Sequence, residues 1–449
     1  MMRSLYSGVS GLKVHQTKMD VIGNNIANVN TVGFKSSSVT FKDVFYQTTQ
    51  TASGPNETTG TGGQNAKQIG LGVSLGAITK NISSEGGSQR TDNPFDMKLG
   101  GDGFFIVNKA GVNYFTRAGA FTTDAAGNLV NADGYNVMGW QADADGNVIK
   151  DTVSKLQIKT SDKLQTPPAK STTTKFTGNI NASDSSFVAT TDAAGAITGY
   201  TGGITMSTQI YDSLGQEYLL TFNVQKTTTA NKYEVTPTGL KSADGTDCSK
   251  ALGITKDADG NVTTPATKIT DFEFNPNTGR LTAPADTVDL NIDWSQVDGK
   301  DAQTLTIDFS ALTSVATETS TKSISDGKAV GLMTGVGVQT DGRIIAAYSN
   351  GDNVCIGQIA VATFDNPAGL ESVGDTLYQT TMNSGMFDGI GEDVSAAGGS
   401  ITTGVLEMSN VDLSTEFTEM ITTQRGFQAN SRIITVSDTM IEELTNLKR

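Results

Sequence analysis

The sequence predicts a mainly β protein with α-helical ends, in which the β part is nested between the two ends of the chain. Both ends carry apolar residues at helical spacing, and the region between them alternates apolar and polar residues and is interrupted by turn dipeptides. Fifty of the 449 residues are glycine, which is typical of many short strands and turns. A chain of this length has room for several domains.

An amphipathic helix is predicted at the start of the chain. One apolar row steps by seven residues, and a second row includes Gly8, His15 and Ile22, so the two rows trace the a and d positions of a coiled coil. The helix would run from Leu5 to Ile26 over roughly 33 Å. His15, the single histidine of the chain, is expected to serve helix packing. The first row is Leu5, Leu12, Met19 and Ile26.

A second amphipathic helix, about 50 Å long, is predicted at the other end. Asn410 or Asp412 would cap its start. The row at steps of seven is Leu413, Met420, Phe427, Ile434 and Ile441, and Phe417, Ile433, Met440 and Leu444 broaden it. Matching apolar stripes at both ends predict an antiparallel pair whose remaining apolar surface is covered by further copies of the chain. The alternative is an ordinary helical hairpin that caps a β domain.

Strand patterns dominate the middle of the chain. Residues 99–107, 113–140 and 342–364 alternate apolar and polar residues and are broken by turn dipeptides, so they predict β-hairpins. The strongest turn signal is Asn350-Gly351, which is typical of a type I′ turn. Residues 151–313 are richer in Thr, Ser, Asp and Lys, and they predict a second, outer β domain inserted into the first.

Four nested parts follow from these patterns. They are a terminal helical, coiled-coil domain of residues 1–30 and 410–449, a linker region of 31–75 and 376–409, an inner β domain of 76–150 and 314–375, and an outer β domain of 151–313.

Composition excludes several classes of function. The formal net charge is −15, yet the first 42 residues hold five Lys or Arg and one Asp, so the acidity lies in the middle, which argues against nucleic acid or anionic lipid as its partner. No stretch approaches the ~20 apolar residues of a membrane span. Cys248 and Cys355 lie too far apart in sequence to indicate a disulfide framework or metal site, so inert thiols are expected.

Motifs for catalysis are absent from the sequence. It contains no P-loop, no G-x-S-x-G and no C-x-x-C, and a single histidine leaves little scope for histidine-based catalysis or metal binding. We therefore predict no enzyme activity, no catalytic residues, no cofactor and no metal site. The acidic, Thr-rich middle taken alone would also suit a secreted β-rich adhesin or glycan-acting protein.

Several segments of the sequence resemble those of the bacterial flagellar axial proteins. "SLYSGVSGLKVHQTKMDVIGNNIANVNTVGFK" is similar to the N-terminal signature of that family, in which N-x-x-N-x-N-T-x-G-F-K is the most specific part. "DMKLGGDGFFIV", "YFTRAGAFTTDAAGNLVNADGYNVMGW" and "NVDLSTEFTEMITTQRGFQANSRIITVSDTM" are similar to further segments in the same order. The insert of residues 151–313 and "YDSLGQEYLLTF" favour hook over distal rod subunits, with the distal rod type as the alternative.

The resemblance implies a structural function outside the cell. Hook subunits polymerise with copies of themselves into a short curved tube, a flexible universal joint that transmits torque from the rod to the filament in flagellum-dependent motility. Their implied partners are the distal rod protein, the hook-filament junction protein, the hook cap and the flagellar type III export apparatus. The resemblance places the chain in the extracellular hook of the flagellum and implies no nucleic acid partner and no membrane insertion.

The asparagine cluster lies where the first helix is expected to give way to a linker. The amides of Asn24, Asn25, Asn28 and Asn30 can donate and accept hydrogen bonds across neighbouring subunits. Simple helix termination by poor helix formers is the alternative for Asn30 and Asn28. Gly33 would permit a turn. The predicted subunit-contact residues are Leu5, Leu12, Met19, Ile22, Asn24, Asn25, Ile26, Asn28, Asn30, Gly33, Phe34, Leu413, Phe417, Met420, Phe427, Ile434, Ile441 and Leu444.

Overall fold

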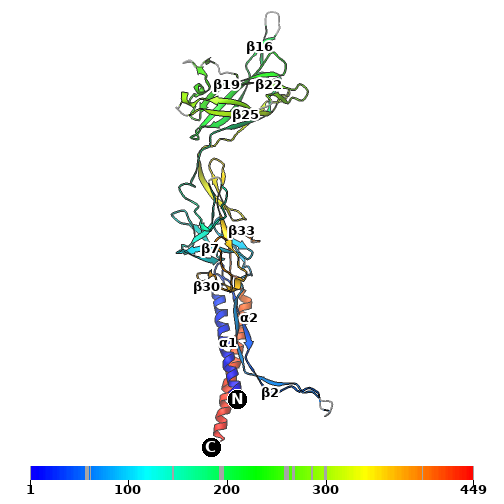
Figure 1. Cartoon of the computed structure of the whole chain (residues 1–449), viewed down its shortest axis with the longest axis vertical. Coiled ribbons are helices and arrows are strands. Elements are labelled where there is room, and N and C mark those ends of the chain that lie inside the picture. Colours follow the sequence, from blue (N-terminus) through cyan, green and yellow to red (C-terminus); the bar gives the residue numbers. More distant parts are fainter. Residues whose placement is uncertain are drawn as a thin grey trace. The chain divides into compact units, whose positions relative to one another are not determined.

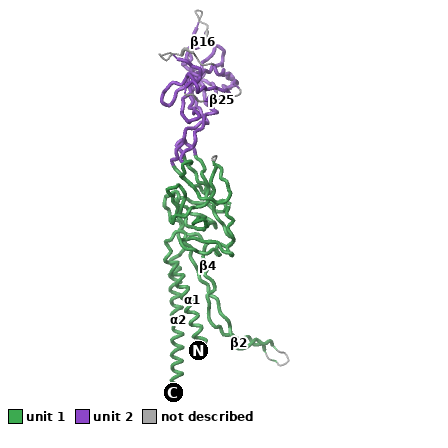
Figure 2. The backbone as a smooth tube through the Cα atoms, turned by 60° about the vertical axis from the view of Figure 1, so that its left-hand side comes forward, with its two compact units in different colours: residues 1–163, 335–347, 353–449 green, residues 164–334, 348–352 purple. Residues whose placement is uncertain are grey.

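The structure is a computed structural model that describes residues 2–55, 60, 62–143, 146–191, 197–256, 262–264, 268–284, 287–297, 301–396 and 398–447. Its two α-helices lie at the two ends of the chain with strands between them, which confirms the predicted fold class (Figure 1). The chain divides into two compact units, coloured in Figure 2. The first comprises residues 1–163, 335–347 and 353–449, and the second comprises 164–334 and 348–352.

The second unit is inserted in the first, as the nested plan predicts, but its limits are not those expected for the outer β domain. Residues after 151 still belong to the first unit, because the Leu156 amide donates to the Val137 carbonyl at 3.0 Å and Leu156 is buried. At the other limit, strand β26 (Ser320–Ser325) pairs with β14 (Thr173–Asn179), so the second unit extends past residue 313. The finer division into four parts stays a prediction.

The two helices lie side by side and antiparallel (Figure 1). Helix α1 spans Met2–Ala27 and helix α2 spans Leu413–Asn446. Asp412 rather than Asn410 is the N-cap of α2, because its carboxylate accepts a hydrogen bond from the Ser414 amide at 2.9 Å. No helix among the described residues is both long and apolar enough to cross a membrane.

A two-stranded ribbon follows α1. Strands β1 (Ser37–Asp43) and β4 (Val73–Lys80) pair antiparallel and lie against this helix. The ribbon continues into a second pair, β2 (Tyr46–Gln50) and β3 (Lys67–Gly70). The ring of Phe41 on β1 meets the ring of His15 edge-on at 5.5 Å, so the ribbon is fastened to the helix by an aromatic contact.

The main sheet of the first unit runs in the order β28-β29-β11-β7-β8-β31-β30. Its core includes the buried side chains of Phe104, Phe115, Trp140 and Tyr378. The hairpins predicted from residues 99–107, 113–140 and 342–364 contribute most of these strands. The bounds are β7 (Phe104–Lys109), β8 (Val112–Thr116), β9 (Phe121–Thr123), β10 (Leu129–Asn131), β11 (Asn136–Gln141), β12 (Ser154–Lys155), β27 (Gly331–Val338), β28 (Arg343–Tyr348), β29 (Asn353–Ala362), η3 (Pro367–Gly369), β30 (Glu371–Gly374), β31 (Leu377–Gln379) and β32 (Glu392–Asp393).

The turn at Asn350-Gly351 joins β28 to β29 as predicted, but it is not type I′. Gly351 has φ +86°, whereas Asn350 is not among the described non-glycine residues with positive φ. The Gly351 amide donates to the Tyr348 carbonyl at 3.0 Å. The Asn350 amide group bonds to Thr166, Ala329 and Asp352. Four residues separate β28 from β29, and a loop of this length built on a type I turn needs only one left-handed residue.

Two short strand pairs join the start of the β region to the segment before α2. Strand β6 (Met97–Gly100) pairs with β33 (Ser400–Thr403), and β5 (Ser88–Arg90) pairs with β34 (Val405–Glu407). Chain segments that are about 300 residues apart in the sequence are therefore paired with each other in this unit.

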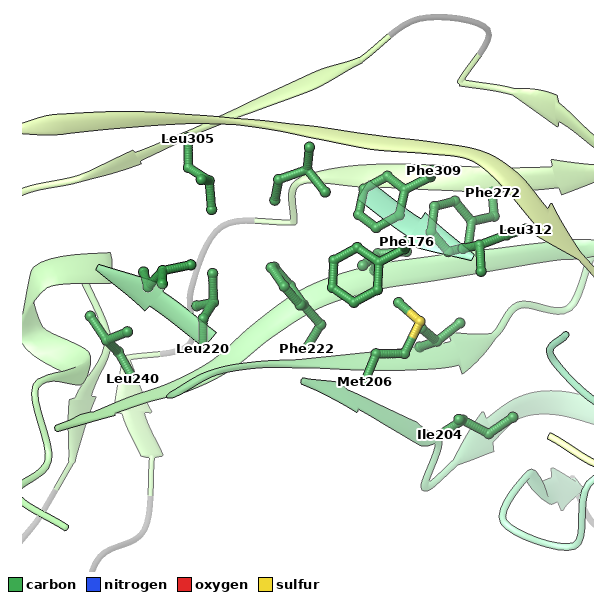
Figure 3. Close-up of a cluster of buried hydrophobic side chains, with 14 of the residues drawn as sticks. Phe176, Ile204, Met206, Leu220, Phe222, Leu240, Phe272, Leu305, Phe309 and Leu312 are labelled. Atoms are coloured by element: carbon green, nitrogen blue, oxygen red, sulfur yellow. The ribbon is translucent and has the colours of Figure 1, made fainter. Parts of the chain in front are cut away.

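The two larger sheets of the second unit enclose one apolar core, part of which Figure 3 shows. One sheet has the order β24-β25-β14-β26 and the other β17-β18-β19-β22-β23. Phe176, Phe222 and Phe309 pack between them (Figure 3). The remaining bounds are β13 (Gln165–Thr166), β15 (Val188–Thr191), β16 (Ile197–Thr201), β17 (Ile204–Tyr211), β18 (Glu217–Lys226), β19 (Lys232–Ser242), η1 (Ser249–Leu252), β20 (Thr255–Lys256), β21 (Val262–Thr264), β22 (Thr270–Phe274), β23 (Leu281–Ala283), β24 (Val288–Ile292), η2 (Trp294–Gln296) and β25 (Gln303–Thr313).

Candidate functional site

The helix pair packs through small residues on one helix that receive large side chains of the other. A Cβ added at Gly11 would lie 2.7 Å from Nδ2 of Asn430, and one added at Gly426 would lie 2.7 Å from Cε1 of His15. Each glycine therefore forms a notch for the opposite side chain. This arrangement confirms that His15 serves helix packing, and it sets the register of the pair.

The apolar residues of α2 fall on three sides of the helix, where the sequence predicted a single stripe. One row faces α1 and is half-buried: Met420, Phe427, Ile434 and Ile441. An N-terminal group is 39% to 60% exposed: Leu413, Phe417 and Ile421. A C-terminal group is 43% to 80% exposed: Ile433, Val436, Met440, Leu444 and Leu447. At about 100° per residue, Phe417 and Ile421 lie on one side of the half-buried row and the C-terminal group lies on the other, while Leu413 continues the row itself.

The last turns of α2 extend past the start of α1. The contacts of Gly11 with Asn430 and of His15 with Gly426 fix an antiparallel register, and continuing this register to Met2 reaches Thr439. The residues from Met440 to Asn446 therefore lie beyond the end of the partner helix. Met440 and Leu444 in this part are 52% and 51% exposed, so their apolar surface lacks a partner among the described residues.

The predicted residues of the first helix differ in how far the single chain already covers them. Ile22 is 2% exposed and Asn25 is 1% exposed. The other predicted positions are half-buried (Leu5, Leu12, Met19, Ile26, Asn28 and Phe34), buried (Gly33) or exposed (Asn24 and Asn30). The structure adds exposed apolar residues that the sequence analysis did not select, namely Tyr6, Val9, Ile421, Val436 and Leu447. Apolar residues spaced by three and four positions, rather than by seven, could have indicated the exposed residues on α2, namely Ile421, Val436 and Leu447.

Asn25 joins three elements of the same chain. Its Nδ2 group donates to the Ser37 carbonyl at 2.8 Å and to Glu416 Oε1 at 2.9 Å, while its Oδ1 accepts from the Ser37 amide at 3.0 Å. Both amide hydrogens are thus engaged between α1, β1 and α2. The sequence analysis expected these amides to act between subunits, and for Asn25 the structure shows bonds within one subunit.

Asn24 and Asn28 make local bonds at the end of α1. Asn28 Nδ2 donates to the Asn24 carbonyl at 2.9 Å and to Asn24 Oδ1 at 3.1 Å, and Asn28 Oδ1 accepts from the Thr31 hydroxyl at 3.0 Å. The Asn24 carbonyl also accepts a hydrogen bond from the Asn28 backbone amide at 3.2 Å, so the side-chain bonds reinforce the last turn of the helix. Within the described chain, Asn24 and Asn28 thus bond locally at the helix end, and their contact between subunits stays a prediction.

A buried ion pair lies where the chain enters and leaves the β region. Lys35 Nζ is 2.8 Å from Glu407 Oε1, and the two side chains are 1% and 0% exposed. Lys35 also donates to the Ser84 carbonyl at 2.7 Å, and Glu407 Oε1 accepts from the Gly86 amide at 3.0 Å. Burial lowers the pKa of Lys35, an effect that its hydrogen bond to Glu407 opposes.

Arg117 adds a second buried cation beside this pair. Its guanidinium lies 4.9 Å from the centre of the Phe104 ring, and burial lowers its pKa while the charge of Glu407 raises it. Arg117 Nε and Glu407 Oε2 have no hydrogen-bond partner among the described residues. The node of Lys35, Glu407 and Arg117 therefore depends on charge balance in a site screened from water.

Backbone contacts around the node fix the path of both connecting segments. Gly33 has φ +68°, and a Cβ there would lie 2.6 Å from the amide nitrogen of Ala118, so only glycine fits. Its amide donates to the Glu407 carbonyl at 2.8 Å. Asn410 accepts from the Ser36 amide at 2.7 Å and donates to the Asn81 carbonyl at 2.8 Å. The predicted turn at Gly33 is therefore confirmed.

The environment of His15 predicts that acid weakens the helix pair. Burial, and next the charge of Lys18, lower the pKa of His15, and its Nδ1 is buried without a partner among the described residues. A lowered pKa means that the folded chain binds this proton less readily than the unfolded chain. The stabilising contribution is then complete above the ordinary value of about 6.5 and is lost as the pH falls below it.

We expect the stability of the helix pair to decrease between pH 7.5 and pH 5.5, and the variant His15→Gln to lose this dependence. The measurement is the thermal unfolding midpoint of both proteins, followed by helical circular dichroism at each pH. Glu416, whose pKa is raised by burial, acts in the opposite direction at lower pH in both proteins, so the difference between them isolates His15. Equal slopes for the two proteins would contradict the assignment.

Comparison with known proteins identifies relatives along the whole chain. Family profiles match four parts: "Flagella basal body rod protein" over residues 5–35, "Flagellar hook protein FlgE/F/G D1 domain" over 98–198, "Flagellar basal body protein FlaE D2 domain" over 179–327, and "Flagellar basal body rod FlgEFG protein C-terminal" over 402–447. The matched parts include α1, α2, the node segment around Lys35 and Glu407, and most of the second unit.

Curated relatives extend over the full length. The flagellar hook protein FlgE of Borreliella burgdorferi is 38% identical over 464 aligned positions, and that of Treponema pallidum is 36% identical over 484. The flagellar basal-body rod protein FlgG of Bacillus subtilis is 30% identical over 449. Each alignment covers 100% of this chain and 100% of the relative.

Proposed function

The chain belongs to the flagellar hook protein family and is a structural subunit of the hook, and we propose that its copies polymerise through their terminal helices into a curved, flexible tube. In this proposal the tube is a universal joint that transmits torque from the rod to the filament and supports motility. The family is structural, and the proposed activity is mechanical rather than catalytic.

The observation that carries the proposal is the pair of exposed apolar groups on opposite sides of α2. Apart from the row that faces α1, helix α2 has apolar surface on two further sides, which suits contact with two different neighbours. Contacts of this head-to-tail kind build helical polymers. Each large side chain that becomes fully buried contributes roughly 1.5 to 3 kcal/mol. The predicted contact residues Leu413, Phe417 and Leu444 are exposed for this role, and Met420, Phe427, Ile434 and Ile441 support it from the side facing α1.

A tube that bends while it turns needs outer contacts that exchange at low cost. The second unit offers surface of this kind, since the side chains of its edge strand β26 alternate between exposed and half-buried and are mainly Ser, Thr and Lys. Polar, hydrated contacts between such surfaces are weaker than apolar ones. We assign bending to them and cohesion to the helices.

Membership of the hook protein family implies several binding partners. We propose that the tube joins the distal rod protein at one end and the hook-filament junction protein at the other, that a hook cap assists its growth, and that the subunits are exported by the flagellar type III apparatus to an extracellular position. These partners are part of the proposal and follow from the family.

Electron microscopy of the purified chain tests the proposal directly. We expect negative staining of concentrated protein to reveal tubes with curvature, and dilution to return them to subunits. Dispersed monomers at every concentration would contradict polymerisation. Binding of a polysaccharide by such monomers would instead support the adhesin hypothesis from the sequence analysis.

A distal rod function is the second candidate, because a rod protein is 30% identical over the whole chain. The same images separate the two. Curved tubes of varying bend support a hook, whereas straight tubes of uniform stiffness support a rod.

A further inference from the structure

The buried pair of Lys35 and Glu407 has the features of a reactive pair as well as those of an ion pair. Lys35 Nζ lies 2.8 Å from Glu407 Oε1, and the two side chains are 1% and 0% exposed. Exclusion of water favours the neutral forms of both groups, because a buried charge loses its hydration. A lysine that is shielded from water in this way can act as a nucleophile.

The two carboxyl oxygens of Glu407 lie in different surroundings. Oε1 accepts hydrogen bonds from Lys35 Nζ and from the Gly86 amide, the second at 3.0 Å. Oε2 has no hydrogen-bond partner among the described residues. A backbone amide that already bonds to an oxygen can stabilise negative charge that develops on it in a transition state. Oε1 is therefore suited to remain as a carbonyl oxygen, whereas nothing described here holds Oε2, which is free to leave.

Neighbouring groups orient the amine and balance the charge of the carboxyl group. The Ser84 carbonyl accepts a hydrogen bond from Lys35 Nζ at 2.7 Å, which holds the nitrogen beside Glu407. The Arg117 side chain is 1% exposed, and the ring of Phe104, itself 0% exposed, lies 4.9 Å from its guanidinium group. The charge of Glu407 acts on Arg117, so the guanidinium acts in return on negative charge at the carboxyl group. The pair thus lies in a dry site with a second cation close by.

We propose that Lys35 and Glu407 form an intramolecular isopeptide bond after the chain has folded. A proton first passes from the ammonium group to the carboxylate, so both groups become neutral. The lone pair of Lys35 Nζ attacks Cδ of Glu407, and negative charge develops on Oε1 beside the Gly86 amide. The Cδ–Oε2 bond then breaks, and Oε2 leaves as water with two of the three protons of the original ammonium group. One amide bond forms, one water is released, and no oxidant or other reactant takes part.

The bond links the segment that follows α1 to the segment that precedes α2. Its two residues are 372 positions apart in the sequence, and a crosslink that closes so long a loop lowers the entropy of the unfolded chain. In the torque-bearing tube proposed above, it keeps the two ends of the β region together under load. Only this use rests on the proposed function, because the bond itself forms within one chain.

The mass of the intact, purified wild-type chain tests the proposal. We expect it to be lower, by one water, than the mass that the sequence requires, and tandem mass spectrometry to find a branched peptide that joins the segments of Lys35 and Glu407. A matched control lies in the same chain, because Lys18 and Glu419 are 3.0 Å apart but 23% and 47% exposed, and these two are expected to stay unlinked. A folded wild-type chain that keeps its full mass after prolonged incubation would overturn the proposal.

Two variants assign the bond to this pair. Lys35→Arg keeps a cation opposite Glu407 but is expected to retain its full mass, because a guanidinium stays protonated and is no nucleophile. Glu407→Gln is expected to lose ammonia in place of water, since nitrogen then replaces the leaving oxygen. Loss of water from Lys35→Arg would contradict the assignment.

The outcomes also separate this proposal from polymerisation. Tubes built from subunits of full mass would overturn the isopeptide bond alone. Subunits that carry the bond and form no tubes would confirm the bond and overturn the proposed polymerisation.

Discussion

Replacing Lys35 with methionine is expected to destabilise the first unit by about 3 to 5 kcal/mol, because it leaves the buried carboxylate of Glu407 without its partner. The nearby positive charge of Arg117 is expected to compensate only part of this lost stability, because the Arg117 Nε makes no hydrogen bond to the Glu407 carboxylate. Denaturant unfolding followed by tryptophan fluorescence measures the change. The chain has two tryptophans, and Trp294→Phe removes the one in the second unit, so Trp140 reports on the first unit alone.

Two further variants separate charge from packing at this node. Lys35→Met combined with Glu407→Gln is expected to be more stable than Lys35→Met alone, because the buried carboxylate that lost its partner is then neutral, although the buried guanidinium of Arg117 remains. Arg90→Met is the matched control, since Arg90 and Asp92 form an ion pair whose side chains are 82% and 73% exposed, and it is expected to change little. If Lys35→Met lowered the free energy of unfolding no more than Arg90→Met does, the node would not stabilise the first unit.

Placing a carboxylate in the exposed N-terminal group of α2 is expected to abolish tube formation while leaving the subunit folded. Phe417 is 50% exposed, so Phe417→Asp costs little in the single chain. In the polymer it would bury an unpaired charge, at about 3 kcal/mol or more for each contact. At about 1.4 kcal/mol for each factor of ten, the concentration required for assembly rises roughly 100-fold. Sedimentation of tubes across a concentration series measures it.

The chain offers a matched control and a contrasting variant. Thr418→Asp adds the same charge one residue further on, at an exposed position that belongs to neither apolar group, and is expected to assemble with a smaller penalty. Phe427→Asp lies in the half-buried row that faces α1, so it is expected to lower the helix content of the subunit as well. Normal tubes from Phe417→Asp would refute the assignment of this group to subunit contact.

Much of the architecture could be predicted from local patterns. Heptad spacing indicated both helices, because a period near 3.6 needs no knowledge of distant residues. Turn dipeptides with alternation indicated the hairpins, although the turn at Asn350-Gly351 has one left-handed residue where a type I′ turn needs two. The glycine at position 33 indicated a turn, and the structure adds the backbone of Ala118 as the reason.

Other features could not be predicted because they depend on residues far apart in the sequence. Nothing near Lys35 indicates that its ammonium group is buried against Glu407, a residue 372 positions later. Helical spacing placed Phe417 and Phe427 in one broadened stripe, although the first lies exposed and the second is half-buried.

The sequence by itself determined the helical ends, the β middle and the nesting of one β region within another, since each follows from short-range periodicity and turn chemistry. Only the tertiary structure decided which apolar residues the chain covers and which it leaves exposed, and which asparagines bond within the chain's own junction. The physical reason is that burial is a property of the packed whole: a side chain is covered by whatever chain segment the fold brings to it, however distant in sequence.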